Sequence, residues 1–251
     1  MKVGVFDSGV GGLSVVKSLL EHNLFEEIIY YGDTARVPYG SKDKNTIIRY
    51  AIEAVEFFKN FEIDMIIVAC NSVSAYGLEE MQEVASIPVV GVVEAGVLAT
   101  ANALEDKTAN ILILGTKATI ASQAYEKGLV QKGLKNLIPL ATPLFVPLVE
   151  EGVFEGKLLQ STLEYYFKDI STPDAIILGC THFPLIAQGI QNYFSNKPIL
   201  IHSGDAIVEY LENNFNINKI KHKTQLRFFA SENPSSLKKT AALWLGIKGE
   251  R

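Results

Sequence analysis

The stretch Ile66-Ile67-Val68-Ala69-Cys70-Asn71-Ser72 decides the fold, because an apolar, β-branched run ends there at a thiol that an amide and a hydroxyl follow at once. Positions 176–182 repeat the pattern, where Ile-Ile-Leu-Gly leads to Cys180, Thr181 and His182. These two cysteines are the only ones in the chain. Such runs are typical of buried strands in parallel sheets, and ligands of open α/β sheets bind at the carboxyl ends of the strands. The sequence therefore predicts that both thiols lie at ligand-binding edges.

Outward from these two stretches, short β-branched runs alternate with longer amphipathic segments, which is the pattern of parallel βα units. In the first part of the chain we expect strands at 3–6, 28–31, 66–69 and 88–93, with helices over 13–20 and 43–60. The pattern then begins again, with strands expected at 110–114, 137–141, 176–179 and 198–202. A tail remains, in which 225–229 is expected to form a strand and 236–245 a helix.

The spacing of residues around the two cysteines indicates an internal repeat. From Asp7, Asp33 and Pro88 to Cys70 the separations are 63, 37 and 18 positions, and from Thr116, Thr142 and Pro198 to Cys180 they are 64, 38 and 18. We therefore predict an α/β fold of two pseudo-symmetric domains with mostly parallel sheets and an active site in the cleft between them. The first domain is expected to comprise residues 1–92 plus 207–251 and to carry Cys70; the second comprises 93–206 and carries Cys180.

Composition excludes several classes of protein. Hydrophobic residues make up 48% of the 251 positions and charged residues 20%, as in ordinary globular proteins. A formal net charge of −5 is no footprint for nucleic acid or anionic lipid. The chain enters a strand pattern at its second residue and contains no apolar run long enough to span a membrane. We expect a cytoplasmic protein with reduced thiols.

Two thiols in matched places have a use if the halves face each other across one small ligand. Removing a proton from a stereocentre and returning one to the other face requires a base and an acid on opposite sides. An unperturbed thiol has a pKa of about 8.5, so one thiolate and one thiol are accessible near neutrality. Asp7 ends the first strand and is placed to orient or deprotonate the Cys70 side, and His182 is placed to do the same for Cys180.

The polar residues at the same strand ends suit the carboxylates of an amino acid, because hydroxyl, amide and backbone N–H groups bind such anions. They are Ser8, Asn71, Ser72, Thr116, Thr119 and Thr181.

Other motifs fit less well. The run DSGVGG at positions 7–12 matches neither a dinucleotide fingerprint nor a P-loop, and Asp7 at its head would repel phosphate. Two cysteines without a C-x-x-C pair or clustered histidines do not favour zinc. Lys117 as a Schiff-base lysine for pyridoxal phosphate would leave both thiols without a purpose. Two cysteines that only fill the core would not explain their polar neighbours or their equivalent registers.

At these residues the sequence resembles the glutamate racemases of the aspartate/glutamate racemase family, cofactor-independent isomerases that supply D-glutamate for peptidoglycan synthesis. The resemblance covers nearly the whole chain. Four motifs carry it: DSGVGG at 7–12, GDTARVPYG at 32–40, ACNS at 69–72 and GCTHFPL at 179–185. The second of these motifs favours glutamate over aspartate. One departure is visible, since Ser72 stands where the family usually has threonine.

The resemblance implies no cofactor, no metal and a homodimer. It implies Cys70 and Cys180 as the two acid/base thiols, and Glu150 as an acidic residue linked to the site. It implies substrate contacts at Asp7, Ser8, Tyr39, Gly40, Asn71, Ser72, Thr181 and His182, with Thr116 and Thr119 nearby.

Two other functions fit part of the pattern. In a cysteine hydrolase or amidase, Cys180 would be the nucleophile and His182 its base, but Cys70 would then be idle. A non-catalytic amino-acid-binding module would also place two α/β lobes around a cleft, although such modules are normally exported. Trp244, the only tryptophan, is expected to pack a C-terminal helix against the core.

Overall fold

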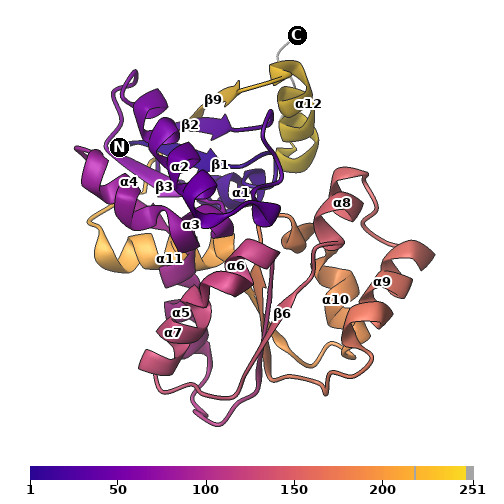
Figure 1. The fold of residues 1–251 in the computed structure, drawn as a ribbon. Helices are drawn as coiled ribbons and strands as arrows, with labels where there is room; N and C mark the ends of the chain where they lie inside the picture. The colour runs from indigo at the N-terminus through magenta and orange to yellow at the C-terminus, as the bar shows by residue number, and fades with distance from the viewer. Residues whose placement is uncertain (218, 247–251) are drawn as a thin grey trace.

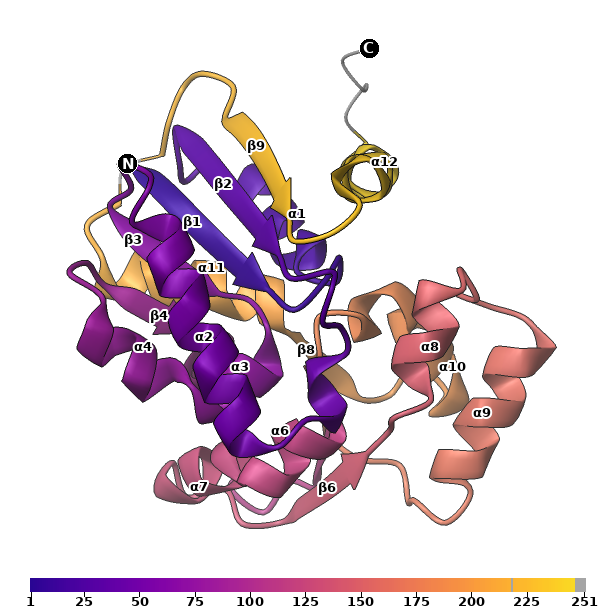
Figure 2. The same cartoon turned by 45° about the horizontal axis from the view of Figure 1, so that its top comes forward.

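The computed structural model describes residues 1–217 and 219–246 and arranges the strands in two parallel sheets (Figure 1). The first sheet has the order β4-β3-β1-β2-β9. Its strands are β1 (Lys2–Asp7), β2 (Glu27–Gly32), β3 (Met65–Val68), β4 (Val89–Gly91) and β9 (Gln225–Ala230). Figure 2 shows β1, β2 and β9 side by side with their arrowheads pointing the same way. The tail of the chain thus adds the edge strand beside β2.

The second sheet has the order β6-β5-β7-β8 and is also wholly parallel. Its strands are β5 (Ile111–Gly115), β6 (Leu137–Ala141), β7 (Ala175–Gly179) and β8 (Ile199–His202). With β1, β2, β3 and β4 taken in the places of β5, β6, β7 and β8, the two strand orders coincide. The predicted repeat is therefore confirmed at the level of topology, and Cys70 and Cys180 follow equivalent strands, β3 and β7. The domain limits at 92/93 and 206/207 stay predictions.

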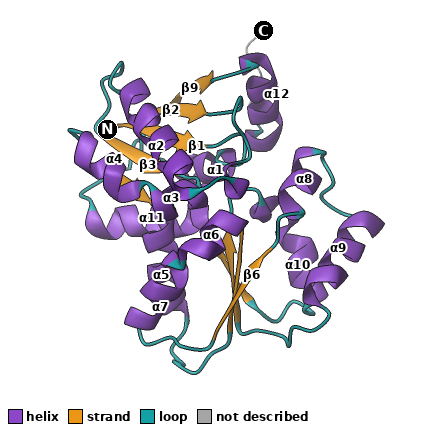
Figure 3. Cartoon of the chain, viewed as in Figure 1, coloured by secondary structure: helices purple, strands orange, loops and turns teal. Residues whose placement is uncertain are grey.

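Helices cover both faces of each sheet, as Figure 3 shows by the purple helices around the orange strands. On the first sheet, α1, α5, α11 and α12 pack on one face and α2, α3 and α4 on the other. On the second sheet, α8, α9 and α10 cover one face, and α5 and α7 the other.

The bounds of these helices are α1 (Leu13–Glu21), α2 (Lys44–Phe58), α3 (Asn71–Tyr76), α4 (Leu78–Val84), α5 (Val92–Ala103), α6 (Lys117–Ser122), α7 (Ala124–Gln131), α8 (Phe145–Glu150), α9 (Lys157–Phe167), α10 (Ala187–Tyr193), α11 (Ser203–Asn214) and α12 (Pro234–Leu245). Two short 3-10 helices, η1 (Tyr39–Ser41) and η2 (Phe183–Ile186), lie in the loops after β2 and β7.

Local chemistry sets several of these boundaries. The Asp43 side chain accepts the N–H of Thr46 at 3.0 Å and so caps the start of α2. The strand predicted over 88–93 ends earlier, at Gly91, because the Ser74 hydroxyl accepts the N–H of Val93 at 3.1 Å and α5 begins there. A contact between distant residues thus overrides the β propensity of two valines.

The carboxyl ends of the strands in one sheet face those of the strands in the other sheet. The strands β1, β3, β5 and β7 are buried along nearly their whole length, as strands covered on both faces must be. β6 is partly exposed and lies at the edge of its sheet. Pro139 has no backbone N–H to donate, and at an edge strand this removes no hydrogen bond between central strands. Among the described residues, no helix combines the length and the apolarity that a membrane crossing requires.

Candidate active site

One small pocket brings the two cysteines together at the carboxyl ends of β3 and β7, and residues from both halves of the molecule line it. They are Ser8, Val37, Pro38, Tyr39, Gly40, Cys70, Asn71, Ser72, Thr116, Val146, Cys180, Thr181 and His182. The predicted convergence of the two halves on one site is thus present in the geometry.

Cys70 is the second of the two residues between β3 and α3, which places it at the sheet edge. Its sulfur lies 3.6 Å from the Ser8 hydroxyl, and only 6% of the residue is exposed. Burial, and after it the negative charge of Asp7, raise the pKa of the Cys70 thiol to about 12. Cys70 is therefore a protonated thiol at neutral pH.

Cys180 faces a different electrostatic environment. Its sulfur lies 3.8 Å from Nδ1 of His182, and the other ring nitrogen, Nε2, lies 2.5 Å from Oε1 of Glu150. Burial alone would lower the pKa of His182, but the hydrogen bonds to Cys180 and to Glu150 raise it to about 10. The two cysteines thus differ: one is held as a thiol, and the other is paired with a cation.

Asp7 links the two halves from behind the pocket. Its Oδ2 accepts the N–H of Gly9 at 2.9 Å, and its Oδ1 accepts the Thr181 hydroxyl at 3.2 Å. Burial raises the pKa of the Asp7 carboxyl, while the charge of His182 acts to lower it. Asp7 thus accepts hydrogen bonds from both halves, and its charge raises the pKa of Cys70.

Three hydroxyl groups form a cluster on the far wall. Ser72 Oγ lies 2.9 Å from Thr116 Oγ1 and 3.3 Å from Thr119 Oγ1, and the two threonine hydroxyls are 3.0 Å apart. Ser72 belongs to α3 of the first half, whereas the threonines belong to the segment after β5. The cluster joins the halves and provides rotatable donors for an oxygen ligand.

The loop after β2 closes the pocket from the first half. Tyr39 donates its hydroxyl to Oδ2 of Asp33, and Nε of Arg36 lies 2.5 Å from the same oxygen. These bonds anchor the loop that carries Gly40 to the wall. A methyl group at Gly40 would lie only 2.4 Å from Cβ of Thr116, so the backbone of this loop packs directly against Thr116 of the other half.

The pocket is closed as it stands. Its volume is about 20 Å³, little more than one water molecule requires. Gly11 shows how tightly the halves meet, since a methyl group there would lie 2.4 Å from Oγ1 of Thr181 and 2.6 Å from Nδ1 of His182. An amino acid can therefore enter only after the halves, or the loop at 37–40, move apart.

Most of the residues predicted for the site line this pocket, and three lie behind it. Asp7 contacts Thr181, Thr119 belongs to the hydroxyl cluster, and Glu150 contacts His182. The apolar wall residues, above all Val146, were absent from the prediction. A valine within an amphipathic helix carries no signal of such a place. Among residues 1–217 and 219–246, no cluster of His, Cys, Asp and Glu is arranged to hold a metal ion.

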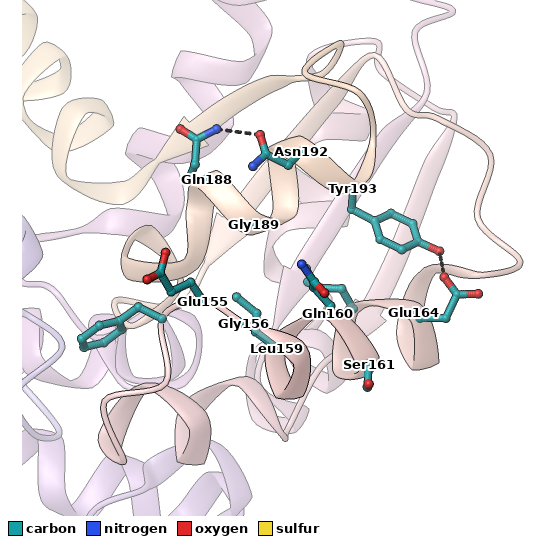
Figure 4. Close-up of a pocket in the computed structure, with 12 residues that line it drawn as sticks. Glu155, Gly156, Leu159, Gln160, Ser161, Glu164, Gln188, Gly189, Asn192 and Tyr193 are labelled. Atoms are coloured by element: carbon teal, nitrogen blue, oxygen red, sulfur yellow. Dashed lines mark hydrogen bonds between the residues drawn. The ribbon is translucent and has the colours of Figure 1, made fainter.

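A much larger cavity, of about 810 Å³, lies between α9 and α10, away from the two cysteines (Figure 4). Two pairs of polar groups that face it are hydrogen-bonded to each other: Gln188 donates to Asn192 at 2.7 Å, and Tyr193 donates to Glu164 at 2.7 Å. No cysteine and no histidine is among its described lining residues. Size alone therefore does not identify the site here.

Known proteins are similar to this chain over nearly its whole length. A family model described as Asp/Glu/Hydantoin racemase matches residues 11–211. The glutamate racemase of Campylobacter jejuni subsp. jejuni is 60% identical over 247 residues, which are 98% of this chain and 99% of that protein.

Solved structures agree with the sequence comparison. The crystal structure of glutamate racemase from Campylobacter jejuni subsp. jejuni has a TM-score of 0.98 at 59% identity, with 100% of both chains covered. The structure of glutamate racemase from Francisella tularensis in complex with D-glutamate has a TM-score of 0.86 at 33% identity and covers 99% of this chain and 95% of that one.

Proposed function

The chain belongs to the Asp/Glu/Hydantoin racemase family, and from that premise we propose that it interconverts L- and D-glutamate by a two-thiol acid/base mechanism. It is an amino-acid racemase, an isomerase. The mechanism, the substrate and the role of the product are the parts that we propose.

The observation that carries the mechanism is the presence of Cys70 and Cys180 in one pocket, each at the end of an equivalent strand. Racemisation removes the α-proton from one face of the substrate and delivers a proton to the other. A single group would have to move around the substrate between these steps, whereas two groups on opposite sides act in place. A repeated α/β unit supplies such a pair from one structural plan.

The two environments assign the starting roles. Cys180, whose sulfur lies 3.8 Å from the His182 ring, is the base that takes the α-proton. Cys70, whose pKa is raised to about 12 by burial, begins as the thiol and gives its proton to the opposite face of the planar carbanion. The S–H bond of Cys180 forms as the Cα–H bond breaks, and the S–H bond of Cys70 breaks as the new Cα–H bond forms. The enzyme is left with the roles exchanged, which is the form that accepts the other enantiomer.

The α-proton of an amino acid is very weakly acidic, so thiol basicity alone is not enough. Preorganised donors around the pocket stabilise the charge that develops on the α-carboxylate. The hydroxyl cluster of Ser72, Thr116 and Thr119 and the amide of Asn71 are the candidates. The closed walls of the pocket also keep bulk water away, which strengthens each of these interactions.

Glutamate is the substrate that the relatives favour, since close relatives are named glutamate racemases and the Francisella tularensis structure contains D-glutamate. We further propose that the protein is a cytoplasmic homodimer that needs no cofactor and that it supplies D-glutamate for peptidoglycan synthesis. This part of the proposal rests on the same family resemblance.

One contact also suits a different reaction. The 3.8 Å approach of Cys180 to His182 is the geometry of a nucleophilic thiol with its base, as a cysteine amidase would need. The second buried thiol in the same pocket favours racemisation instead, because an amidase has no use for Cys70. Trapping of an acyl-enzyme on Cys180 would favour the amidase.

The test follows the optical rotation of L-glutamate with purified protein and no added cofactor, with L-aspartate as the specificity control. We expect rotation to fall to zero with glutamate, and Cys70→Ser or Cys180→Ser to lower kcat by at least about 10³-fold, since each removes an obligatory acid or base. Near-parental turnover in either variant would contradict the two-thiol mechanism. Unchanged rotation with the parent protein would contradict glutamate as the substrate.

A further inference from the structure

Asn71 stands between the first catalytic cysteine and the hydroxyl cluster, and its side chain is held from the opposite half of the molecule. It follows Cys70 directly, lines the pocket and is 2% exposed. Its Oδ1 accepts the hydroxyl of Tyr125 at 2.7 Å, and its Nδ2 donates to Oγ of Ser203 at 3.2 Å. Tyr125 belongs to α7 and Ser203 to α11.

The direction of these bonds fixes the orientation of the amide. The Ser203 hydroxyl donates to the carbonyl oxygen of Leu178 at 3.4 Å, and its oxygen accepts the N–H of Asn71. In this network the amide nitrogen faces Ser203, and the amide oxygen faces Tyr125. Within the described part of the chain, the second N–H of Nδ2 has no protein acceptor and is left for a ligand in the pocket.

Tyr125 itself has little freedom to move. The residue is 1% exposed, and its ring lies between two glycines. A methyl group at Gly96 would stand 3.0 Å from Cε1 of the ring, and one at Gly179 would stand 3.2 Å from Cε2. Gly179 is the last residue of β7 and immediately precedes Cys180. Burial raises the pKa of the Tyr125 phenol, so its hydroxyl keeps the proton that it donates.

We propose that Tyr125 is a positioning residue for the racemase reaction: its ring rests against the strand end that carries Cys180, and its hydroxyl holds the amide that follows Cys70. One rigid side chain thereby sets the two thiols relative to each other and aims the free N–H of Asn71 at an oxygen of the substrate. The proposal rests on the proposed function. It concerns a residue that touches neither the substrate nor the reacting atoms.

The test is a double-mutant cycle of Tyr125→Phe and Asn71→Ala, measured as kcat/KM for glutamate racemisation. Tyr125→Phe keeps the ring and removes one hydrogen bond, for which we expect about a tenfold loss, equal to about 1.4 kcal/mol. If Tyr125 acts through Asn71, adding Tyr125→Phe to Asn71→Ala costs nothing more. A tyrosine that only stabilised the fold would lower kcat/KM by the same factor in both backgrounds.

Two further variants complete the experiment. Tyr193→Phe removes a tyrosine hydrogen bond, to Glu164, far from the pocket and is the matched control, which should keep the parental kcat/KM. If Tyr125→Phe does not fold, as judged by circular dichroism, Gly96→Ala takes its place in the cycle because it displaces the ring from a helix outside the pocket.

The inference is overturned if the variant used keeps the parental kcat/KM, or if its loss is additive with that of Asn71→Ala. A parent protein that fails to racemise glutamate would instead refute the proposed function, so the two failures are distinguishable.

Discussion

Substitution of Gly40 by alanine tests whether catalysis depends on the close meeting of the two halves. Gly40 lies in η1, on the loop that closes the pocket, and its backbone φ lies outside the left-handed region, so alanine adds no backbone strain. The new methyl carbon would lie 2.4 Å from Cβ of Thr116 and 2.5 Å from its Cγ2. The first of these atoms is fixed to the backbone of the opposite half and cannot rotate away.

The geometry gives the size of the effect. Non-bonded carbon atoms rest at about 3.5–4.0 Å, so the loop must retreat from Thr116 by more than about 1 Å. A displacement of about 1 Å at a catalytic site costs on the order of 10²-fold in rate. We therefore expect kcat/KM for glutamate racemisation to fall about 100-fold. Each half keeps its own core, so the free energy of unfolding should change by less than about 1 kcal/mol.

The assay combines racemisation kinetics with urea unfolding, and Gly189→Ala is the matched control. Its methyl group would stand 2.9 Å from Cδ2 of Leu159, the end of a flexible side chain between α9 and α10, far from the pocket. We expect the control to keep the parental kcat/KM. Parental kinetics in Gly40→Ala would refute the reasoning, because they would mean that the closed contact with Thr116 is not needed for turnover.

Two further predictions concern the electrostatics beside Cys180. Glu150→Gln removes a charge that raises the pKa of His182. The alkaline limb of the pH profile of kcat should therefore move to lower pH by at least about one unit, with about tenfold less activity at pH 9.5. Glu151→Gln is the control, and an alkaline limb that does not move in Glu150→Gln would contradict the role of Glu150. The pKa of His182 is raised from its ordinary 6.5 to about 10, so the stability it contributes is complete below pH 6.5 and is lost as the pH rises through 10. The free energy of unfolding of the parent minus that of His182→Gln should therefore fall by about 2 to 5 kcal/mol across this window, and a pH-independent difference in urea titrations would show that the imidazolium is absent.

The sequence predicts much of the fold because strands and helices are recognisable from local patterns of apolar residues and from the turn residues between them. The strands that carry Cys70 and Cys180 are recognisable from their β-branched runs, and the matched spacings indicate the repeat before any contact is known. The strand expected over 88–93 shows where this reasoning ends. Its last two residues become helical because Ser74, from another element, caps the N–H of Val93.

Some residues of the site can likewise be predicted from the sequence, and others cannot. Residues that follow strand ends, such as Asn71 and Thr181, can be predicted because the carboxyl edge of a parallel sheet is where ligands bind. Tyr125 and Ser203 could not be, since nothing in their neighbourhoods distinguishes them from core residues. Their roles depend on a contact between halves that exists only in the folded chain.

The central claim is that two different thiols act on the two faces of the substrate, and isotope transfer at early conversion tests it most directly. L-Glutamate is incubated with enzyme equilibrated in deuterated water, the reaction is stopped at low conversion, and the separated enantiomers are analysed for deuterium at Cα by mass spectrometry. The two-thiol mechanism predicts deuterium in the D-glutamate formed and protium in the remaining L-glutamate, because one thiol delivers a deuteron taken up from the solvent while the other keeps the proton it removed. D-Glutamate that retains the protium of its substrate would contradict the account, since one group would then have carried the same proton from face to face.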